Sequence, residues 1–371
     1  MRISRTLTLA VGAATLVAGA FTTNAVAGAQ HHRAHTSART LDHVFVIMLE
    51  NHARESVINR PNMPYTTHLA NKYAQASKYY GVTHPSEPNY IASTSGSNWW
   101  SNSDDPAQRF AHRNIVDELS AHHVRWAAYM EAMPKRGWLG DYWPSSTNAL
   151  YASKHNPFIL YPDVRNNAER RTHIRPYTAM KRDLNRRHTP RYVWISPDQC
   201  NDLHGGVYTP VEGFPESQHC GYSNAYDPTD PNEIALEKNA DAFVKKTVGT
   251  IMSSNAWTRH SAIFIVADEG DYNGNYPQNN DWSDVSGCCD SPVLPAGDPD
   301  ISPDWPGGVY GGGVIPAIVI SPRGPRHYVD STRQYNHYSM LLTMEQGLGL
   351  GKLGFTSDSR QVKPMWGLIR R

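Results

Sequence analysis

Short apolar runs that end in acidic residues are the most regular pattern in this chain. Three such runs are residues 44–49 before Glu50, 192–195 before Asp198, and 262–267 before Asp268. Continuous runs rich in Val and Ile are typical of strands buried on both faces, as in parallel sheets. In open α/β sheets the functional groups gather at the carboxyl ends of the strands. The pattern therefore predicts an α/β fold with acids collected at one sheet edge.

Acids gathered at one edge would repel one another unless a cation joined them. A single acid would carry little weight, because acids often begin polar loops. Here two of the positions are polar doublets, Glu50-Asn51 and Asp268-Glu269, and Asp202 follows the second run. We therefore interpret these strand ends as a metal site.

Helical segments alternate with the apolar runs. Apolar residues recur at helical spacing in 232–252, and Asn114 can cap a helix before the strand-like segment 124–129. Residues 314–320, with Pro316 among them, fit an outer strand. Strands alternating with helices predict a three-layer α/β/α sandwich with a mostly parallel central sheet.

The first residues differ from the rest. A short basic stretch, an apolar segment at 7–21 and small residues at 25–27 match a secretory signal peptide, and the apolar segment is too short for a membrane span. We expect residues 1–29 to be this signal and residues 30–371 to form a single catalytic domain of a secreted, extracellular protein.

The charge of the chain bears on its partners. A formal net charge of +1 argues against nucleic acid or an anionic membrane surface as the main partner. No other stretch of the sequence is long and apolar enough to cross a bilayer. We therefore expect a small-molecule substrate, no stable membrane anchor and a monomer.

The four cysteines lie in two long loops, Cys200 and Cys220 in 197–232, and Cys288 and Cys289 in 268–313. An export signal and an even number favour disulfide bonds over a zinc site. Three pairings are possible. A bond between the adjacent cysteines would be strained, so we favour bridges between the two loops, which would hold them around the site.

Ser86 is the candidate nucleophile. Pro88 is tolerated in the first turn of a helix that Tyr90 would continue, which places Ser86 at a helix N-terminus. Backbone N–H groups and the helix dipole favour a phosphate there. The alternative is a simple capping serine. The sequence has no Gly-x-Ser-x-Gly elbow, which argues against an acyl-transferring α/β-hydrolase.

Six short motifs occur in this order: Glu50-Asn51-His52, His84-Pro85-Ser86-Glu87-Pro88-Asn89-Tyr90, Lys154-His155-Asn156-Pro157, Asn201-Asp202-Leu203-His204, Asp268-Glu269-Gly270 and Tyr335-Asn336-His337-Tyr338-Ser339. The ordered set resembles the phosphoesterase family of secreted acid phosphatases and bacterial phospholipases C, within the alkaline phosphatase superfamily. The resemblance implies an alkaline-phosphatase-like fold and phosphoric ester hydrolysis. The resemblance is weaker in the two long loops. Loops of this kind determine which substrate an enzyme accepts.

The resemblance also implies roles for individual residues. The implied metal ligands are Glu50, Asn51, Ser86, Asp268 and Glu269. Positions that hold a second ion in two-metal relatives, or contact the phosphate or leaving group in one-metal relatives, are Asp202, His204 and His337. Asn89 matches an amide that holds a phosphoryl oxygen. His155 and Glu131 match positions in the substrate pocket.

The implied chemistry is phosphoryl transfer through a serine. A divalent cation activates the hydroxyl group of Ser86, which attacks phosphorus and forms a phosphoseryl intermediate. His204 or His337 would protonate the leaving oxygen, or hold a second ion. One or two ions are therefore expected. Zinc is favoured in superfamily relatives and suits the histidines, whereas the oxygen ligands also suit Ca²⁺, Mg²⁺ or Mn²⁺.

Several functions fit these residues. We expect a small phosphomonoester or a glycerophosphodiester as substrate, with a phospholipase C acting on intact phospholipid as the alternative. A secreted binding protein with an inactive site is a third hypothesis, although no expected ligand is missing. A sulfatase is disfavoured because Ser86-Glu87-Pro88-Asn89 lacks the required Arg. Aromatic residues that could line the substrate rim are Trp99, Trp100, Trp138, Tyr142 and Trp143.

Overall fold

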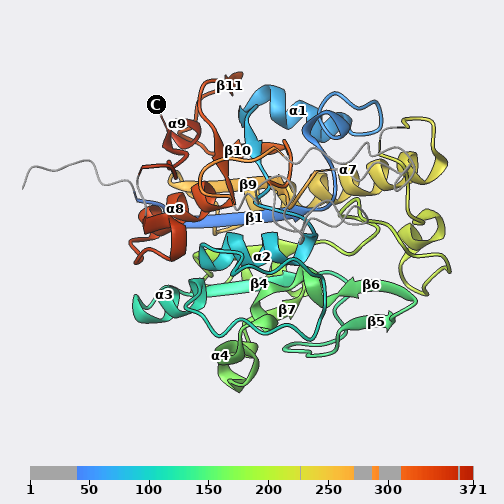
Figure 1. The fold of residues 1–371 in the computed structure, drawn as a ribbon, viewed down its shortest axis with the longest axis horizontal. Helices are drawn as coiled ribbons and strands as arrows, with labels where there is room; N and C mark the ends of the chain where they lie inside the picture. The colour runs from blue at the N-terminus through green and yellow to red at the C-terminus, as the bar shows by residue number, and fades with distance from the viewer. Residues whose placement is uncertain (1–39, 226, 271–285, 292–310, 358–359, 371) are drawn as a thin grey trace, which may run out of the picture. The chain divides into compact units, whose positions relative to one another are not determined.

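An eight-stranded sheet runs through the computed structural model, which describes residues 40–225, 227–270, 286–291, 311–357 and 360–370 (Figure 1). In spatial order its strands are β11 (Tyr328–Asp330), β2 (Ala74–Ala76), β10 (Ala317–Ile320), β9 (Ser261–Ala267), β1 (His43–Leu49), β8 (Tyr192–Ser196), β4 (Trp126–Met130) and β7 (Ile174–Pro176). Two short sheets pair β12 (Tyr335–Asn336) with β3 (Tyr79–Tyr80), and β5 (Tyr142–Ser145) with β6 (Asn148–Ala152).

The centre of the main sheet is parallel. Strand β1 pairs with β9 on one side and β8 on the other, and β4 and β7 continue beyond β8 in the same direction. All residues of β1, β8 and β9 are buried, which explains why the sequence shows continuous apolar runs there. The carboxyl ends of these strands consequently meet at one sheet edge.

Strand β10 corrects one expectation. It starts after Pro316 and runs antiparallel between β9 and β2, so it is an inner strand of the sheet and not an outer one. Pro316 precedes the first ladder residue, so its missing N–H group does not interrupt the pairing. The short strands β2 and β11 lie outside it, and their length gave no clear sequence signal.

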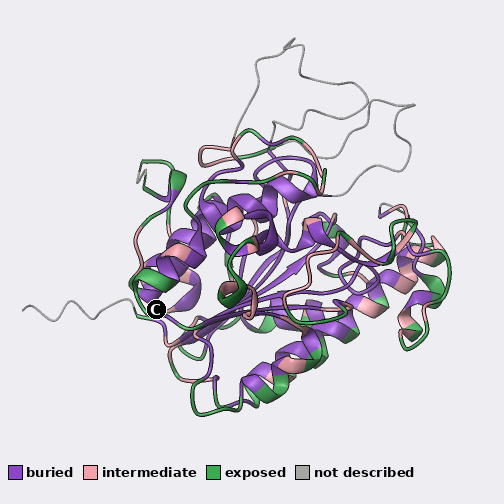
Figure 2. Cartoon of the chain, turned by 90° about the horizontal axis from the view of Figure 1, so that it is seen from below, coloured by how far each residue is buried: buried purple, intermediate pink, exposed green. Residues whose placement is uncertain are grey.

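Helices cover both faces of the sheet, and Figure 2 shows the buried strands between them. The α-helices are α1 (Pro64–Lys72), α2 (Ser86–Ser95), α3 (Ile115–Ala121), α4 (Pro162–Arg165), α5 (Ala168–Arg171), α6 (Met180–Asp183), α7 (Pro231–Met252), α8 (His337–Leu348) and α9 (Trp366–Ile369). Helix α1 packs on α7, and α2 packs on α8. The expected three-layer sandwich with a mostly parallel sheet is confirmed.

Local signals for two helices also hold. Helix α7 spans nearly the predicted segment and buries its apolar stripe, including Phe243 and Val244. Asn114 caps α3 with a hydrogen bond from the backbone N–H of Val116. The predicted signal peptide, residues 1–29, lies outside the described residues. Among the residues that the structure describes, no helix is both long and apolar enough to cross a membrane.

The disulfide bonds form within the loops rather than between them. Cys200 pairs with Cys220, and Cys288 pairs with its neighbour Cys289, so the favoured connectivity was wrong. The first loop folds back on itself through paired backbone groups of Val207 and Cys220, which brings the Cα atoms of its two cysteines to 5.3 Å. The described part of the chain contains no free cysteine, as the export signal predicted.

Candidate active site

The ends of β1 and β9 bring two acidic segments together. Leu49 and Ala267 are register partners, so the residues that follow them leave the sheet side by side. The backbone N–H of Asp268 donates to the carbonyl of Leu49 at 3.0 Å. The N–H of Asn51 in turn donates to Asp268 Oδ1, also at 3.0 Å. Parallel pairing therefore explains how residues more than 200 positions apart share one site.

Ser86 lies against this pair of segments. It is the first residue of α2, and its side chain is buried. Its Oγ atom is 2.9 Å from Glu50 Oε2, 2.9 Å from Glu269 Oε1 and 3.3 Å from Asn51 Oδ1. Three oxygens thus surround the hydroxyl group. A hydroxyl group has one proton to donate, so it can satisfy only one of them at a time.

This oxygen set fits a divalent cation. Glu50, Asp268 and Glu269 are fully buried, and among the described residues Asp268 Oδ2 has no hydrogen-bond partner. Burial and the neighbouring Glu50 raise the pKa of Asp268 well above its usual range. Burial also raises the pKa of Glu269, although His84 at its Oε2 opposes the shift. A bound cation would remove this repulsion.

His155 joins the metal-ligand candidates to Asp202. Its Nε2 atom lies 3.0 Å from Glu50 Oε1, and its Nδ1 atom lies 3.2 Å from Asp202 Oδ2. Its ring stacks on Tyr90 in α2, with centroids 5.4 Å apart. Burial alone would lower the pKa of His155, but the two carboxylates raise it to about 9. His155 therefore belongs to the site itself.

His204 completes a cluster that could hold a metal ion. Ligand atoms of Glu50, His155 and His204 all lie within 4.8 Å of one another. Burial and the nearby Lys154 lower the pKa of His204 to about 3, so its ring is neutral. Its Nε2 atom lies 3.0 Å from Lys154 Nζ. Asp202 and His204, two of the three positions grouped from the sequence, thus lie beside His155, whereas the third, His337, is engaged elsewhere.

A cavity of about 360 Å³ opens onto Ser86. Its walls include Asn51, Glu269, Lys154 and Tyr222, so carboxylate, amide, ammonium and aromatic groups face the same space. The size suits a small ligand held by a few polar groups.

Two predicted catalytic residues do not reach this cavity. His337 starts α8, and its Nε2 lies 2.6 Å from the backbone carbonyl of Asp268, which can only accept a hydrogen bond. Its Nδ1 lies 3.2 Å from the hydroxyl of Tyr79. Both ring nitrogens are therefore engaged, and burial lowers the pKa of His337 to about 4. The ring of His337 thus holds the backbone of Asp268 in place through this hydrogen bond.

Asn89 also has a structural position. Its Oδ1 accepts hydrogen bonds from the N–H groups of Val82 and Thr83, and its Nδ2 donates to the carbonyls of Thr83 and Pro85. The amide is buried and is fully used by the backbone just before Ser86. Asn89 thus fixes the approach to the nucleophile position, and its amide does not line the cavity.

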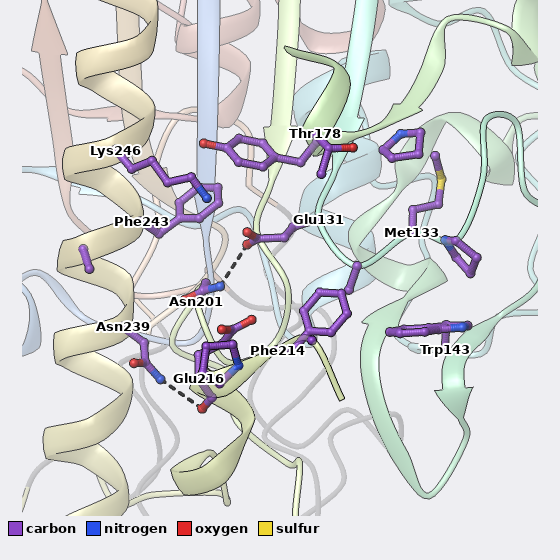
Figure 3. A pocket seen from close by; sticks show the side chains of 17 residues that line it. Glu131, Met133, Trp143, Thr178, Asn201, Phe214, Glu216, Asn239, Phe243 and Lys246 are labelled. Carbon is purple, nitrogen blue, oxygen red and sulfur yellow. Dashed lines mark hydrogen bonds between the residues drawn. The ribbon is translucent and has the colours of Figure 1, made fainter. Parts of the chain in front are cut away.

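Glu131 lies in a different cavity, of about 1000 Å³ (Figure 3). Its Oε2 accepts a hydrogen bond from Asn201 Nδ2 at 3.0 Å, and Phe214, Trp143 and Phe243 form other walls of this cavity. Burial raises the pKa of Glu131 to about 7. The structure therefore separates Glu131 from the cavity of Ser86.

None of the five aromatic residues expected at the substrate rim is among the described residues that line the cavity of Ser86. Trp143 lines the cavity of Glu131, and Trp99 stacks on His112 with ring centroids 3.6 Å apart. Trp100 is 75% exposed. Tyr142 lines a small neighbouring pocket that also contains Lys154.

Sequence reasoning missed two charged residues of the site. Lys154 stands beside His155 in the motif Lys154-His155-Asn156-Pro157, and the sequence alone indicates no role for the lysine. Its Nζ donates to Asp104 Oδ2 at 2.8 Å. Asp104 also accepts the N–H of Glu87 and so connects the lysine to α2. Asp104 has no sequence signal of its own, because it lies in an irregular segment.

The sandwich, the acids at the strand ends and the buried serine define an α/β site that could hold a metal ion. The chain belongs to the phosphoesterase family, whose model matches residues 56–216 and 224–351. This confirms the family inferred from the ordered motifs.

Two relatives named as phosphatases agree with this placement, and one solved structure shares the fold. The "Phosphate-repressible acid phosphatase" of Penicillium chrysogenum is 30% identical over 204 residues, which cover 55% of this chain and 42% of that protein. The chain therefore spans less than half of that relative. The "Phosphatidylinositol-3-phosphatase" of Mycobacterium tuberculosis is 22% identical over 329 residues, which cover 88% of this chain and 84% of that protein. A structure from work on glycosaminoglycan metabolism by Bacteroides thetaiotaomicron shares the fold, with a TM-score of 0.51, 9% identity, and coverage of 90% and 83%.

Proposed function

We propose that this protein is a metal-dependent phosphoester hydrolase in which Ser86 is the nucleophile. The observation that carries the proposal is the arrangement of Glu50, Asn51 and Glu269 oxygens within 3.3 Å of the hydroxyl group of Ser86, which lines a cavity. Family membership supports the same chemistry. The names of the relatives refer to phosphatases, which favours a phosphoric ester as substrate.

A divalent cation would be held by Glu50, Asn51, Asp268 and Glu269 together with the Ser86 oxygen. When bound, it would lower the pKa of the serine hydroxyl and neutralise charge on the phosphoryl group. Zinc is the ion we propose first. Ca²⁺, Mg²⁺ and Mn²⁺ are the alternatives, because the donor set offers mainly oxygens.

The residues of the chain then have separate roles in the reaction. The Ser86 Oγ–H loses its proton to one of the carboxylate oxygens 2.9 Å away, and Oγ attacks phosphorus. The bond from phosphorus to the ester oxygen breaks, and the alcohol leaves with a proton from water. A second water then attacks phosphorus, and Ser86 regains its proton as phosphate departs. Lys154 and a protonated His155 supply positive charge beside the phosphoryl group.

We propose a small phosphomonoester or glycerophosphodiester as the substrate of a secreted enzyme. A cavity of about 360 Å³ accommodates a phosphoryl group and a compact alcohol. The small cavity is the feature that favours this substrate class over intact phospholipid. Phospholipase C activity and a binding protein without activity remain the alternatives.

A substrate panel tests the proposal. We expect p-nitrophenyl phosphate and deacylated glycerophospho head groups to be hydrolysed, with loss of activity in chelator and recovery on adding zinc. Intact phospholipid vesicles should react more slowly. Faster hydrolysis of vesicles would favour phospholipase C, activity that survives complete metal removal would contradict metal dependence, and no hydrolysis of any substrate would favour the binding protein.

A further inference from the structure

Lys154 occupies a position that a second metal ion would need. It comes from the 3-10 helix η2 (Ser153–His155), and its side chain is only 14% exposed. Its ammonium group donates to Asp104 Oδ2 at 2.8 Å and lies 3.0 Å from His204 Nε2. A buried cation therefore already contacts the imidazole that relatives with two ions would use as a ligand.

The proton positions on His204 follow from its two neighbours. Its Nδ1 lies 2.9 Å from the carbonyl oxygen of Gly205, which can only accept, so Nδ1 carries the proton. The ammonium of Lys154 can only donate, so the Nε2 lone pair of His204 points at Lys154. A metal ion that took this lone pair would have to displace the lysine.

The other expected ligands of a second ion are also engaged. Asp202 Oδ1 accepts the N–H of His204 at 2.8 Å, and its Oδ2 lies 3.2 Å from His155 Nδ1. His337 uses one ring nitrogen for Tyr79 and the other for the carbonyl of Asp268. An ion bound by these three residues would cost several hydrogen bonds.

We propose that the Lys154 ammonium takes the place of a second metal ion, so that the site binds one divalent cation and Lys154 binds the phosphoryl group. The inference rests on the proposed function. An ammonium group has three N–H donors, of which Asp104 and His204 account for two. Because Lys154 lines the Ser86 cavity, the third donor can reach a phosphoryl oxygen there.

The test combines metal counting with phosphate binding, and neither readout needs turnover. The full-length protein is equilibrated with zinc and dialysed, and its zinc content is measured by mass spectrometry. Binding of inorganic phosphate is measured by calorimetry for wild type, Lys154→Ala and Lys154→Met. Lys246→Ala is the matched control, because Lys246 lines the cavity of Glu131 instead.

We expect one zinc per wild-type chain, and phosphate affinity reduced about tenfold or more in both Lys154 variants, since a charge-assisted hydrogen bond is lost. The control should bind phosphate like wild type. Two zinc ions per wild-type chain, or unchanged phosphate affinity in a folded Lys154 variant, would overturn the inference. An active two-zinc enzyme would leave the proposed function intact, whereas full activity of Ser86→Ala would remove that function instead.

Discussion

Two pairs of acidic positions follow neighbouring strands at the same edge of the sheet, yet only the first pair lies in the segments that contact the hydroxyl group of Ser86. Glu50 and Asp268 follow β1 and β9. Glu50 contacts Ser86 directly, and Asp268 is followed by Glu269, which also contacts Ser86. Glu131 and Asp198 follow β4 and β8, and the N–H of Asp198 donates to Glu131 Oε2 at 3.3 Å. The two pairs resemble each other in sequence and differ in what faces them.

The difference lies in the neighbouring helix and in counter-charge. The first pair faces the start of α2 and lies close to Lys154 and His155. Glu131 of the second pair faces a cavity bounded by α7 and by aromatic side chains. Burial, followed by the charge of Glu131, raises the pKa of Asp198 well above its usual range. An acid at a strand end becomes a candidate ligand only when other oxygens and cations converge on it.

The sharpest contrast between the two regions is expected for Ser86→Ala. Removing the nucleophile should lower the turnover of p-nitrophenyl phosphate by about 10³-fold or more. Ser93→Ala is the matched control, because this buried serine of α2 only donates to the carbonyl of Tyr90 in its own helix. Comparable losses in both variants would mean that α2 matters for folding and not for chemistry.

Metal binding should distinguish the two acid pairs directly. We expect Asp268→Asn to weaken zinc binding by about 100-fold or more, because it removes a charged candidate ligand. Asp198→Asn should keep the zinc content of wild type. Zinc per chain after dialysis is the measurement. Equal zinc loss in both variants would place the metal elsewhere, or show that the two regions act as one.

The disulfide of the first loop supports both regions, because Asn201 contacts Glu131 while Asp202 and His204 face the active site. Replacing Cys200 and Cys220 by serine should lower the free energy of unfolding by about 3 kcal/mol, since the bond closes a loop with a sequence separation of 20 residues.

Denaturant unfolding measures this loss. The double replacement of Cys288 and Cys289 is the control, because adjacent cysteines close almost no loop and their loss should change stability little. An equal effect of both replacements would contradict the loop-closure explanation.

The smallest expected effect concerns Glu131→Gln. The pKa of Glu131 is about 7 in the folded chain against a reference value of 4.5, so the folded state holds a proton that the unfolded state releases between these values. Its contribution to stability is therefore complete below about pH 4.5 and is lost as the pH rises through about 7, by at most about 1.4 kcal/mol per pH unit.

Glutamine cannot ionise, so the stability of the variant should fall less steeply between pH 5 and 8. Unfolding free energies measured across this range check the slope. The variant should also keep its turnover and zinc content, because Glu131 does not line the Ser86 cavity. Parallel stability curves, or loss of activity, would show that Glu131 takes part in the active site.

The sequence could predict the centre of the fold because buried parallel strands leave a continuous apolar signal. The strand ends, the start of a helix and the family resemblance together predicted that Glu50, Asn51, Ser86 and Asp268 lie close to one another. In the structure Ser86 contacts Glu50 and Asn51, and Asn51 contacts Asp268. The sequence could not separate Glu131 from this group. Acids at strand ends share a cavity only if the order of the strands and the position of the neighbouring helix bring them together. The residues next to each acid in the sequence do not reveal either feature.

The remaining differences arise from contacts between distant segments. Asn89 and His337 belong to recognisable motifs, but their side chains are used by Thr83, Tyr79 and the backbone of Asp268. A motif identifies a position without stating which partner its side chain contacts. Lys154 was overlooked for the same reason, because its importance comes from Asp104 and His204, 50 residues away on either side.

Helix α2 is buried along its whole length, and the strands β1 and β9, which precede the acids, are buried at every residue. Backbone amides in such elements exchange with solvent only when most of the protein opens. The geometry around Ser86 should therefore depend on the slowest-exchanging part of the molecule. On heating, we expect activity to persist until cooperative unfolding, whereas the exposed residues near Tyr208 should exchange early without loss of turnover.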